Sequence, residues 1–195
     1  MGIGTARGQI LIISFRSAAE FRKWLTANHD KSDGIWLQIF KKNSDTASIT
    51  YAEALDEALC FGWIDGQKQK HDDQSWLQKF TRRRAKSGWS RINTGHAERL
   101  IRAGRMRPPG HAEVDAAKKD GRWKAAYDSP SNASFPDDFL AALSKDPKAK
   151  AFFDSLNKAN RYAISYRLQT AKKPETLQKR MQMILGMLAR GEAFH

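Results

Sequence analysis

Apolar and polar residues in the first eighty positions follow the pattern of a small sheet with two helices. Short apolar or alternating runs rich in aromatic and branched residues predict four strands, the first of them buried. Two capping boxes, in which a Ser or Thr is followed three residues later by Glu, begin at Ser17 and Thr50 and predict helices. The predicted strands cover residues 9–15, 35–40, 67–70 and 75–81.

Turn signals divide this half of the chain. Gly62 is expected to stop the second helix in a left-handed conformation. Asp65-Gly66 is expected to turn the chain before the third strand, and Asp72-Asp73 to turn it before the fourth. The predicted order is therefore strand, helix, strand, helix and two further strands.

Beyond residue 90, apolar residues recur at helical spacing. Helices are predicted over 93–103 and 111–119, with a break at Pro108-Pro109-Gly110 between them. Residues 129–136 have the composition of a linker, and capping residues or prolines then start further helices at Pro136, Asp146, Asn157 and Pro174. We therefore expect the α+β class, with a small N-terminal sheet and its helices over 1–128. A C-terminal helical region over 129–195 is expected to pack on it.

The distribution of charge along the chain indicates a function as well as a fold. The 195 residues carry a net charge of +13, but residues 1–60 hold seven basic and seven acidic side chains, so the excess begins after them. Such asymmetry favours an anionic partner, which could be nucleic acid, a phosphorylated small molecule or an acidic membrane surface. The other interpretation is that the charge serves solubility alone.

The basic excess is densest over residues 82–107, which hold nine Lys or Arg and a single acid, Glu98. This run leaves the last predicted strand and enters a helix that Ser90 or Asn93 could cap. Amide groups at a helix start beside arginines can bind phosphate or carboxylate. The predicted anion site comprises Arg83, Lys86, Ser87, Ser90, Arg91 and Asn93.

Asp65, Trp89 and segment 160–167 have two interpretations each. Asp65, flanked by Trp63, is either an ordinary turn residue or the rim of a pocket, paired there with an arginine from the run. Trp89 either stacks on a base or another planar ligand, or fills the core where strand gives way to helix. The aromatic and basic segment 160–167 either adds to a nucleic-acid surface or packs between the two regions.

The sequence lacks the motifs of several classes of catalytic and nucleotide-binding protein. Phosphate-binding loops, dinucleotide fingerprints and nucleophile elbows are missing, and the histidines share no metal-ligand spacing, so we expect no metal and no cofactor. The single cysteine, Cys60, fits a reducing compartment and is expected to be a buried thiol. Residues 1–8 lack a secretory pattern, so we expect a cytoplasmic protein without a membrane span; its oligomeric state stays open.

Several blocks resemble the YdeI/OmpD-associated family, whose members are also called bacteriocin-protection proteins. The most distinctive block is Phe61-Gly62-Trp63-Ile64-Asp65-Gly66, and Arg82 stands where relatives tend to have proline. The resemblance implies a bacterial protein linked to envelope stress or antimicrobial tolerance, without catalytic residues to carry over. The similar segments are 48–67, 80–90, 121–123, 125–127, 160–162 and 172–176.

These observations favour a non-enzymatic cytoplasmic protein of the stress or bacteriocin-protection type. Its expected partner is anionic, either nucleic acid or a phosphorylated ligand, and it is expected to bind at the basic strand-to-helix junction. The alternative is an enzyme or small-ligand-binding protein with a pocket near Trp63, Asp65, Arg83 and Trp89.

Overall fold

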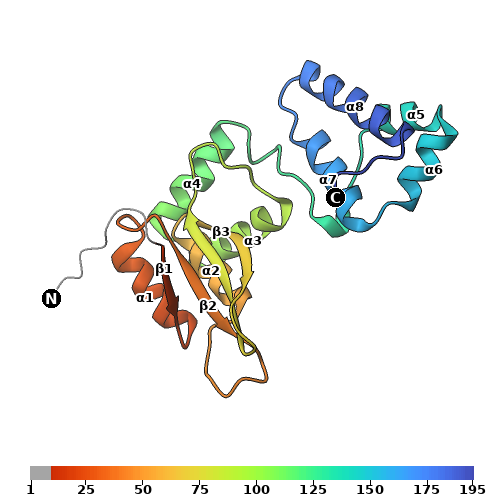
Figure 1. Cartoon of the computed structure of the whole chain (residues 1–195). Coiled ribbons are helices and arrows are strands. Elements are labelled where there is room, and N and C mark those ends of the chain that lie inside the picture. The colour runs from red at the N-terminus through yellow and green to blue at the C-terminus, as the bar shows by residue number, and fades with distance from the viewer. Residues whose placement is uncertain (1–9) are drawn as a thin grey trace. The chain divides into compact units, whose positions relative to one another are not determined.

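The computed structural model of the chain describes residues 10–195 (Figure 1). The expectations for residues 1–8, and residue 9 of the first predicted strand, lie outside this range. The described residues form two compact units. Unit 1 runs to Ser87 and resumes over Gly95–Asp120, whereas unit 2 comprises Gly88–Thr94 and Gly121–His195. The division between 128 and 129 that the sequence suggested stays a prediction.

Unit 1 contains a four-stranded sheet in the order β1-β2-β4-β3. The edge strand β1 is parallel to β2, and the other neighbouring strands are antiparallel. Ile35, Leu37 and Ile39 alternate along β2 and are buried, as the sequence pattern predicted. The prediction of a buried first strand is wrong, because Leu11 and Ile12 are about half exposed at the sheet edge. The strands are β1 (Leu11–Ser14), β2 (Gly34–Phe40), β3 (Trp63–Lys70) and β4 (Ser75–Arg82).

Two capped helices, α1 (Ala18–Asn28) and α2 (Tyr51–Cys60), pack on the sheet. The Oγ of Ser17 accepts a hydrogen bond from the Glu20 amide and so caps α1, while Thr50 and Glu53 form the complete capping box of α2. Phe21 of α1 lies 5.9 Å from the ring of Phe80 in β4, and α2 contacts β3. Both helices therefore contribute to one apolar core.

Gly62 connects α2 to β3 in the left-handed conformation that the sequence predicted. Its φ is 73°, and a Cβ there would lie 2.9 Å from the carbonyl oxygen of Pro109. The predicted turn at Asp65-Gly66 is wrong, because both residues lie within β3. The pairing of β3 with β4 shifts between Asp65 and Lys68, so the chain accommodates this dipeptide as a strand irregularity.

Two further helices follow the sheet, α3 (Arg91–Arg102) and α4 (Pro108–Lys119). The predicted break at Pro108-Pro109-Gly110 is wrong, because these residues form the first turn of α4. Proline suits that position, since its missing amide would have no helical partner there. A Cβ on Gly110 would come within 2.4 Å of the carbonyl oxygen of Cys60, so only glycine allows this close approach.

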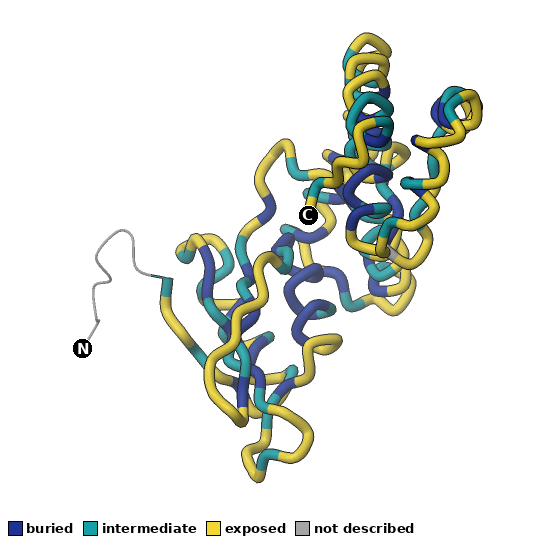
Figure 2. The backbone as a smooth tube through the Cα atoms, turned by 45° about the vertical axis from the view of Figure 1, so that its right-hand side comes forward, coloured by how far each residue is buried: buried dark blue, intermediate teal, exposed yellow. Residues whose placement is uncertain are grey.

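Unit 2 is mainly helical around its own apolar core (Figure 1). Asp146 and Asn157 cap α6 and α7, as predicted. Exposed and buried residues alternate along the C-terminal helices in Figure 2, as expected for amphipathic helices. The α+β class with a C-terminal helical region is thereby confirmed. Its elements are the short 3-10 helix η1 (Pro130–Asn132), α5 (Asp137–Ser144), α6 (Pro147–Ser155), α7 (Lys158–Gln169) and α8 (Pro174–Ala189).

Candidate anion-binding site

Part of the basic run over 82–107 is bound to acids of α2. The guanidinium of Arg99 lies 2.6 Å from the Oδ1 of Asp56, and that of Arg105 lies 2.7 Å from the Oε1 of Glu57. Glu57 also binds Arg22 of α1 at 2.7 Å, and its side chain is only 3% exposed. These arginines therefore hold α1, α2 and the end of α3 together, and their charge is largely offset by the two acids.

The junction between β4 and α3 differs from the predicted anion site. The side chain of Arg83 is only 7% exposed, whereas Lys86 is exposed. The Oγ of Ser87 accepts a hydrogen bond from the Arg84 amide at 3.1 Å, and the Oγ of Ser90 accepts one from the Asn93 amide at 3.2 Å. Both hydroxyl groups thus stabilise the local backbone by accepting hydrogen bonds from nearby amides. Ser90 is the residue that caps α3.

Trp63 and Asp65 have separate environments within unit 1. Trp63 is fully buried, and its Nε1 donates to the carbonyl oxygen of His29 at 3.1 Å. The Oδ2 of Asp65 accepts a hydrogen bond from the Tyr51 hydroxyl at 2.7 Å. Burial, together with that hydrogen bond to the carboxylate, raises the pKa of Tyr51. Trp63 is therefore a core residue, and Asp65 orients the tyrosine at the start of α2.

Trp89 is buried, which favours the second of its two interpretations. It is 2% exposed, and its ring centroid lies 4.9 Å from that of Trp123. The Tyr127 amide donates to the carbonyl oxygen of Trp89 at 3.0 Å, and the Arg91 amide donates to the carbonyl oxygen of Tyr127 at 2.9 Å. Segment 88–91 is thus joined to residue 127 like a short parallel strand pair.

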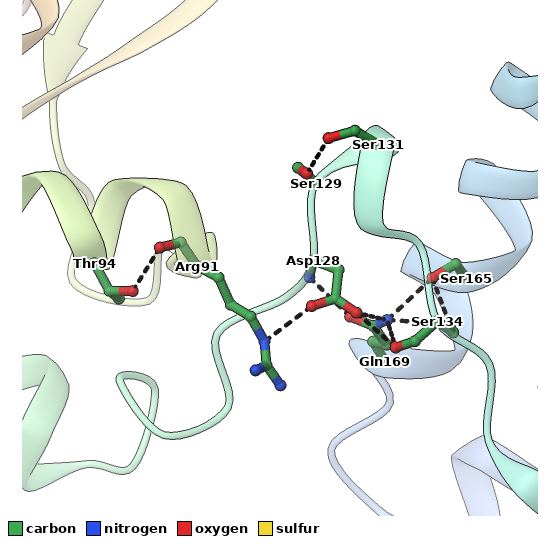
Figure 3. A network of polar contacts seen from close by, with 8 residues as sticks. All are labelled: Arg91, Thr94, Asp128, Ser129, Ser131, Ser134, Ser165 and Gln169. Atoms are coloured by element: carbon green, nitrogen blue, oxygen red, sulfur yellow. Dashed lines mark hydrogen bonds and ion pairs between the residues drawn. The ribbon is translucent and has the colours of Figure 1, made fainter.

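Arg91 emerges from this pair and is held by a buried carboxylate. Its Nε lies 2.9 Å from the Oδ1 of Asp128, yet its side chain is 72% exposed. Figure 3 shows that the two Nη atoms lie on the side of the guanidinium away from Asp128. Among the residues predicted for the site, Arg91 combines a fixed position with an accessible charge.

A network of polar side chains holds Asp128 in turn (Figure 3). Its Oδ2 accepts hydrogen bonds from the Ser134 hydroxyl at 2.6 Å and the Gln169 amide at 2.9 Å, and its own backbone amide donates to Gln169. Burial alone would raise the pKa of Asp128, but these hydrogen bonds and the charge of Arg91 outweigh it and lower the pKa. The carboxylate therefore stays charged and keeps Arg91 in place.

Three tyrosines continue from this network onto α7. The rings of Tyr127 and Tyr166 meet edge to face at 5.0 Å, and Tyr162 lies 6.0 Å from Tyr166. Burial raises the pKa of Tyr162, and the nearby Tyr166 and Asp128 raise it further. This places Tyr162 within electrostatic reach of the carboxylate that holds Arg91.

An open cavity of about 530 Å³ lies beside these rings on α7. Its walls are mostly apolar, but Lys158 and Arg167 give it a basic margin. We call Arg91, Tyr127 and the cavity together the tyrosine surface. The cavity is lined by Lys158, Ala159, Tyr162, Ala163, Tyr166, Arg167 and His195.

The segment that carries His195 is fixed beside the cavity. The buried side chain of Asn160 accepts hydrogen bonds from the Phe194 and His195 amides, both at 3.0 Å. The guanidinium of Arg167 lies 3.8 Å from the centre of the Phe194 ring. His195 therefore belongs to the cavity wall, which the sequence did not indicate.

Sequence reasoning missed most of what holds this site. Asp128, Ser134 and Gln169 are far apart in the chain and lie in no periodic pattern, so no sequence signal joins them. Segment 160–167 was recognised as aromatic and basic, and it supplies Tyr162 and Tyr166. The tyrosine surface is therefore partly visible in the sequence, whereas its support is not.

Residues 10–195 offer little support for a metal site, a cysteine nucleophile or a membrane-spanning helix. No cluster of three or more metal-ligating side chains occurs within this range. Cys60 is buried, and burial followed by the charge of Glu57 raises the pKa of its thiol to about 11, which disfavours the nucleophilic thiolate. Over the same part of the chain, no helix has the length and hydropathy needed to cross a membrane.

Comparison with known families follows the division between the sheet and the C-terminal helices. A family model described as "Domain of unknown function (DUF8412)" matches residues 13–113, more than half of the chain. The chain belongs to this family. The DUF8412 match begins in β1 and ends within α4, so it includes the strands β2 to β4 and the whole basic run.

A second model, described as "Bacteriocin-protection, YdeI or OmpD-Associated", matches residues 132–191. The resemblance predicted from the sequence is thereby confirmed, and the protein is bacteriocin-protection-like. The match covers α5 to α8, whereas two of the segments that carried the resemblance, 48–67 and 80–90, lie within the DUF8412 match. No curated protein and no solved structure matches the chain.

Proposed function

We propose that this DUF8412 protein is a non-enzymatic binding protein for nucleic acid, with the tyrosine surface as its contact site. The observation that carries the proposal is the arrangement of Arg91, whose Nε is held by Asp128 while most of its side chain is exposed. A guanidinium fixed at one edge keeps its remaining N–H groups available to phosphate oxygens and loses little conformational entropy on binding.

Charge on the neighbouring helix supports the same partner. The twelve residues of α7 include Lys158, Arg161 and Arg167 and no acid. Lys158 and Arg167 line the cavity and provide its basic margin, whereas Arg161 lies over the ring of Phe153. Basic side chains interleaved with exposed aromatic rings are typical of nucleic-acid-binding surfaces.

The proposal moves the contact site relative to the one expected from the sequence. Arg83 is buried, and the hydroxyl groups of Ser87 and Ser90 bind backbone amides, so these residues are less suited to a phosphate. Of the residues predicted at the strand-to-helix junction, Arg91 is retained in the proposed contact site. The alternative of an enzyme or small-ligand pocket loses support, because its proposed walls Trp63 and Trp89 are both buried.

A role in antimicrobial or stress tolerance is part of the proposal and is supported by the bacteriocin-protection match. A cytoplasmic location is also part of it and is supported by the single reduced cysteine. Nucleic acid is preferred over a phosphorylated small molecule because unit 2 offers several basic side chains, with Arg91 beside Asp128, and with Lys158 and Arg167 at the cavity.

The test is a titration of labelled DNA of about 20 nucleotides, single-stranded or duplex, at about 50 to 200 mM salt. The variant Arg91→Ala/Lys158→Ala should bind about tenfold more weakly, and its salt slope should fall by about one to two units. The variant Lys145→Ala/Lys148→Ala removes the same charge from exposed positions outside the surface and serves as the control. Absence of binding to any DNA at the lowest salt, or equal losses in both variants, would overturn the proposal.

A further inference from the structure

The cavity on α7 has features that phosphate binding alone does not require. Its volume of about 530 Å³ falls within the range of about 300–1,000 Å³ typical of small-ligand pockets, and its walls are mostly apolar. A phosphate group needs donors and positive charge, which Lys158 and Arg167 already offer at the margin. The apolar interior therefore suits a flat, uncharged group that is attached to phosphates.

The space exists because α7 alternates small and aromatic residues on one face. Ala159 and Ala163 leave room beside Tyr162 and Tyr166, which stand one turn apart. Tyr166 is 40% exposed, and Tyr162 is only partly covered. Aromatic rings with an accessible face stabilise unpaired bases by stacking, largely irrespective of base identity.

We infer that this cavity accepts an unpaired base, so that the protein's target is single-stranded rather than double-stranded nucleic acid. The inference rests on the proposed function and names its substrate class. In a duplex, each base is stacked and paired, and only its edges reach the grooves. A single strand can turn a base into the cavity while its flanking phosphates contact Arg91, Lys158 or Arg167.

Charge complementarity argues for this occupant rather than a protein segment. The side chains that line the cavity include those of Lys158 and Arg167 and none of an acidic residue. Asp128, whose charge acts on Tyr162, is buried and bound to Arg91. An anionic chain with planar apolar groups therefore matches both the charge and the walls of the cavity.

The experiment compares three labelled oligonucleotides of equal length with the full chain: oligo-dT, a blunt duplex and an abasic strand that keeps its phosphates. Oligo-dT should bind about five- to a hundredfold more tightly than the abasic strand, which is the range expected for stacking of one base. Tyr162→Ala should remove this difference and leave binding of the abasic strand and the duplex unchanged. Tyr162→Phe keeps the ring and should behave as the wild type.

Ala159→Leu provides a second variant that should fold, because residue 159 is exposed on α7 and leucine is a good helix former. It places a bulky side chain beside Tyr162 and should reduce the affinity for oligo-dT toward that for the abasic strand. If the wild type binds oligo-dT and the abasic strand equally, the inference fails while the proposed function stands. If none of the three oligonucleotides binds at low salt, the proposed function fails as well.

Discussion

Two groups of basic residues in this protein, one with Arg99 and Arg105 and the other with Arg91 and α7, have different surroundings. In the run over 82–107, Arg99 and Arg105 face Asp56 and Glu57 of α2, so their charges are largely offset within unit 1. On the tyrosine surface of unit 2, α7 carries basic residues without an acid, and the carboxylate that binds Arg91 leaves its outer N–H groups exposed. The local density of basic residues in a sequence is therefore a poor measure of the charge that a partner meets.

The largest expected effect is a loss of stability when the buried ion pairs of Glu57 are removed. Glu57→Ala would leave Arg22 and Arg105 without their buried carboxylate, and loss of one partner of a buried ion pair costs about 3–5 kcal/mol. Urea unfolding at neutral pH measures this loss. Glu98→Ala, an exposed acid in the same run, should change the free energy of unfolding by less than about 0.5 kcal/mol. Similar values for the two variants would show that the buried pairs contribute nothing special.

An intermediate effect is expected in unit 2 and depends on pH. Asp128→Asn removes a charged acceptor of several hydrogen bonds and should cost about 1.5–3 kcal/mol at neutral pH. Because folding lowers the pKa of Asp128, its stabilising contribution is present above the unfolded pKa of about 3.9 and is lost as the pH falls through the folded pKa.

The difference in stability between the wild type and Asp128→Asn should therefore shrink on acidification, which urea unfolding from neutral pH down to about pH 3 would record. Asp154→Asn, which affects only an exposed pair with Lys150, should show almost no difference at any of these pH values. A difference that stays constant down to the lowest pH would contradict the role given to the ionised carboxylate.

The smallest expected effect is a change in heparin binding when part of the charge of Arg99 and Arg105 is made accessible. Asp56→Asn weakens the hold on Arg99 and Arg105, so the variant should elute from heparin at higher salt, with a salt slope steeper by up to about one unit. Asp45→Asn in an exposed loop changes the net charge equally without releasing a guanidinium. Equal shifts of the two variants would mean that net charge alone governs retention.

Local features of the fold were predictable from the sequence because their determinants are neighbours in the chain. The caps at Ser17, Thr50, Asp146 and Asn157 and the left-handed Gly62 follow from side chains within a few residues. The turn predicted at Asp65-Gly66 failed because pairing with β4 overrides a local preference. Tertiary hydrogen bonding thus decided where the local signal was ambiguous.

The candidate site was less predictable, because the groups that decide it come together only in the fold. Arg99 meets Asp56, which lies 43 residues earlier, and Asp128 meets Gln169, which lies 41 residues later. Nothing near Arg99 or Arg91 in the sequence shows which one keeps more of its side chain exposed. A basic run therefore predicted an anionic partner but could not identify the arginine best placed to meet it.

The interleaving of the two units limits how the protein can be divided. Gly88–Thr94 belongs to unit 2, although most of unit 1 precedes it and the rest follows it. A fragment beginning at Gly121 would lack Trp89, which packs on Trp123, and Arg91, which binds Asp128. Any transplant of the tyrosine surface into another protein must therefore carry residues 88–94 as well as the C-terminal stretch.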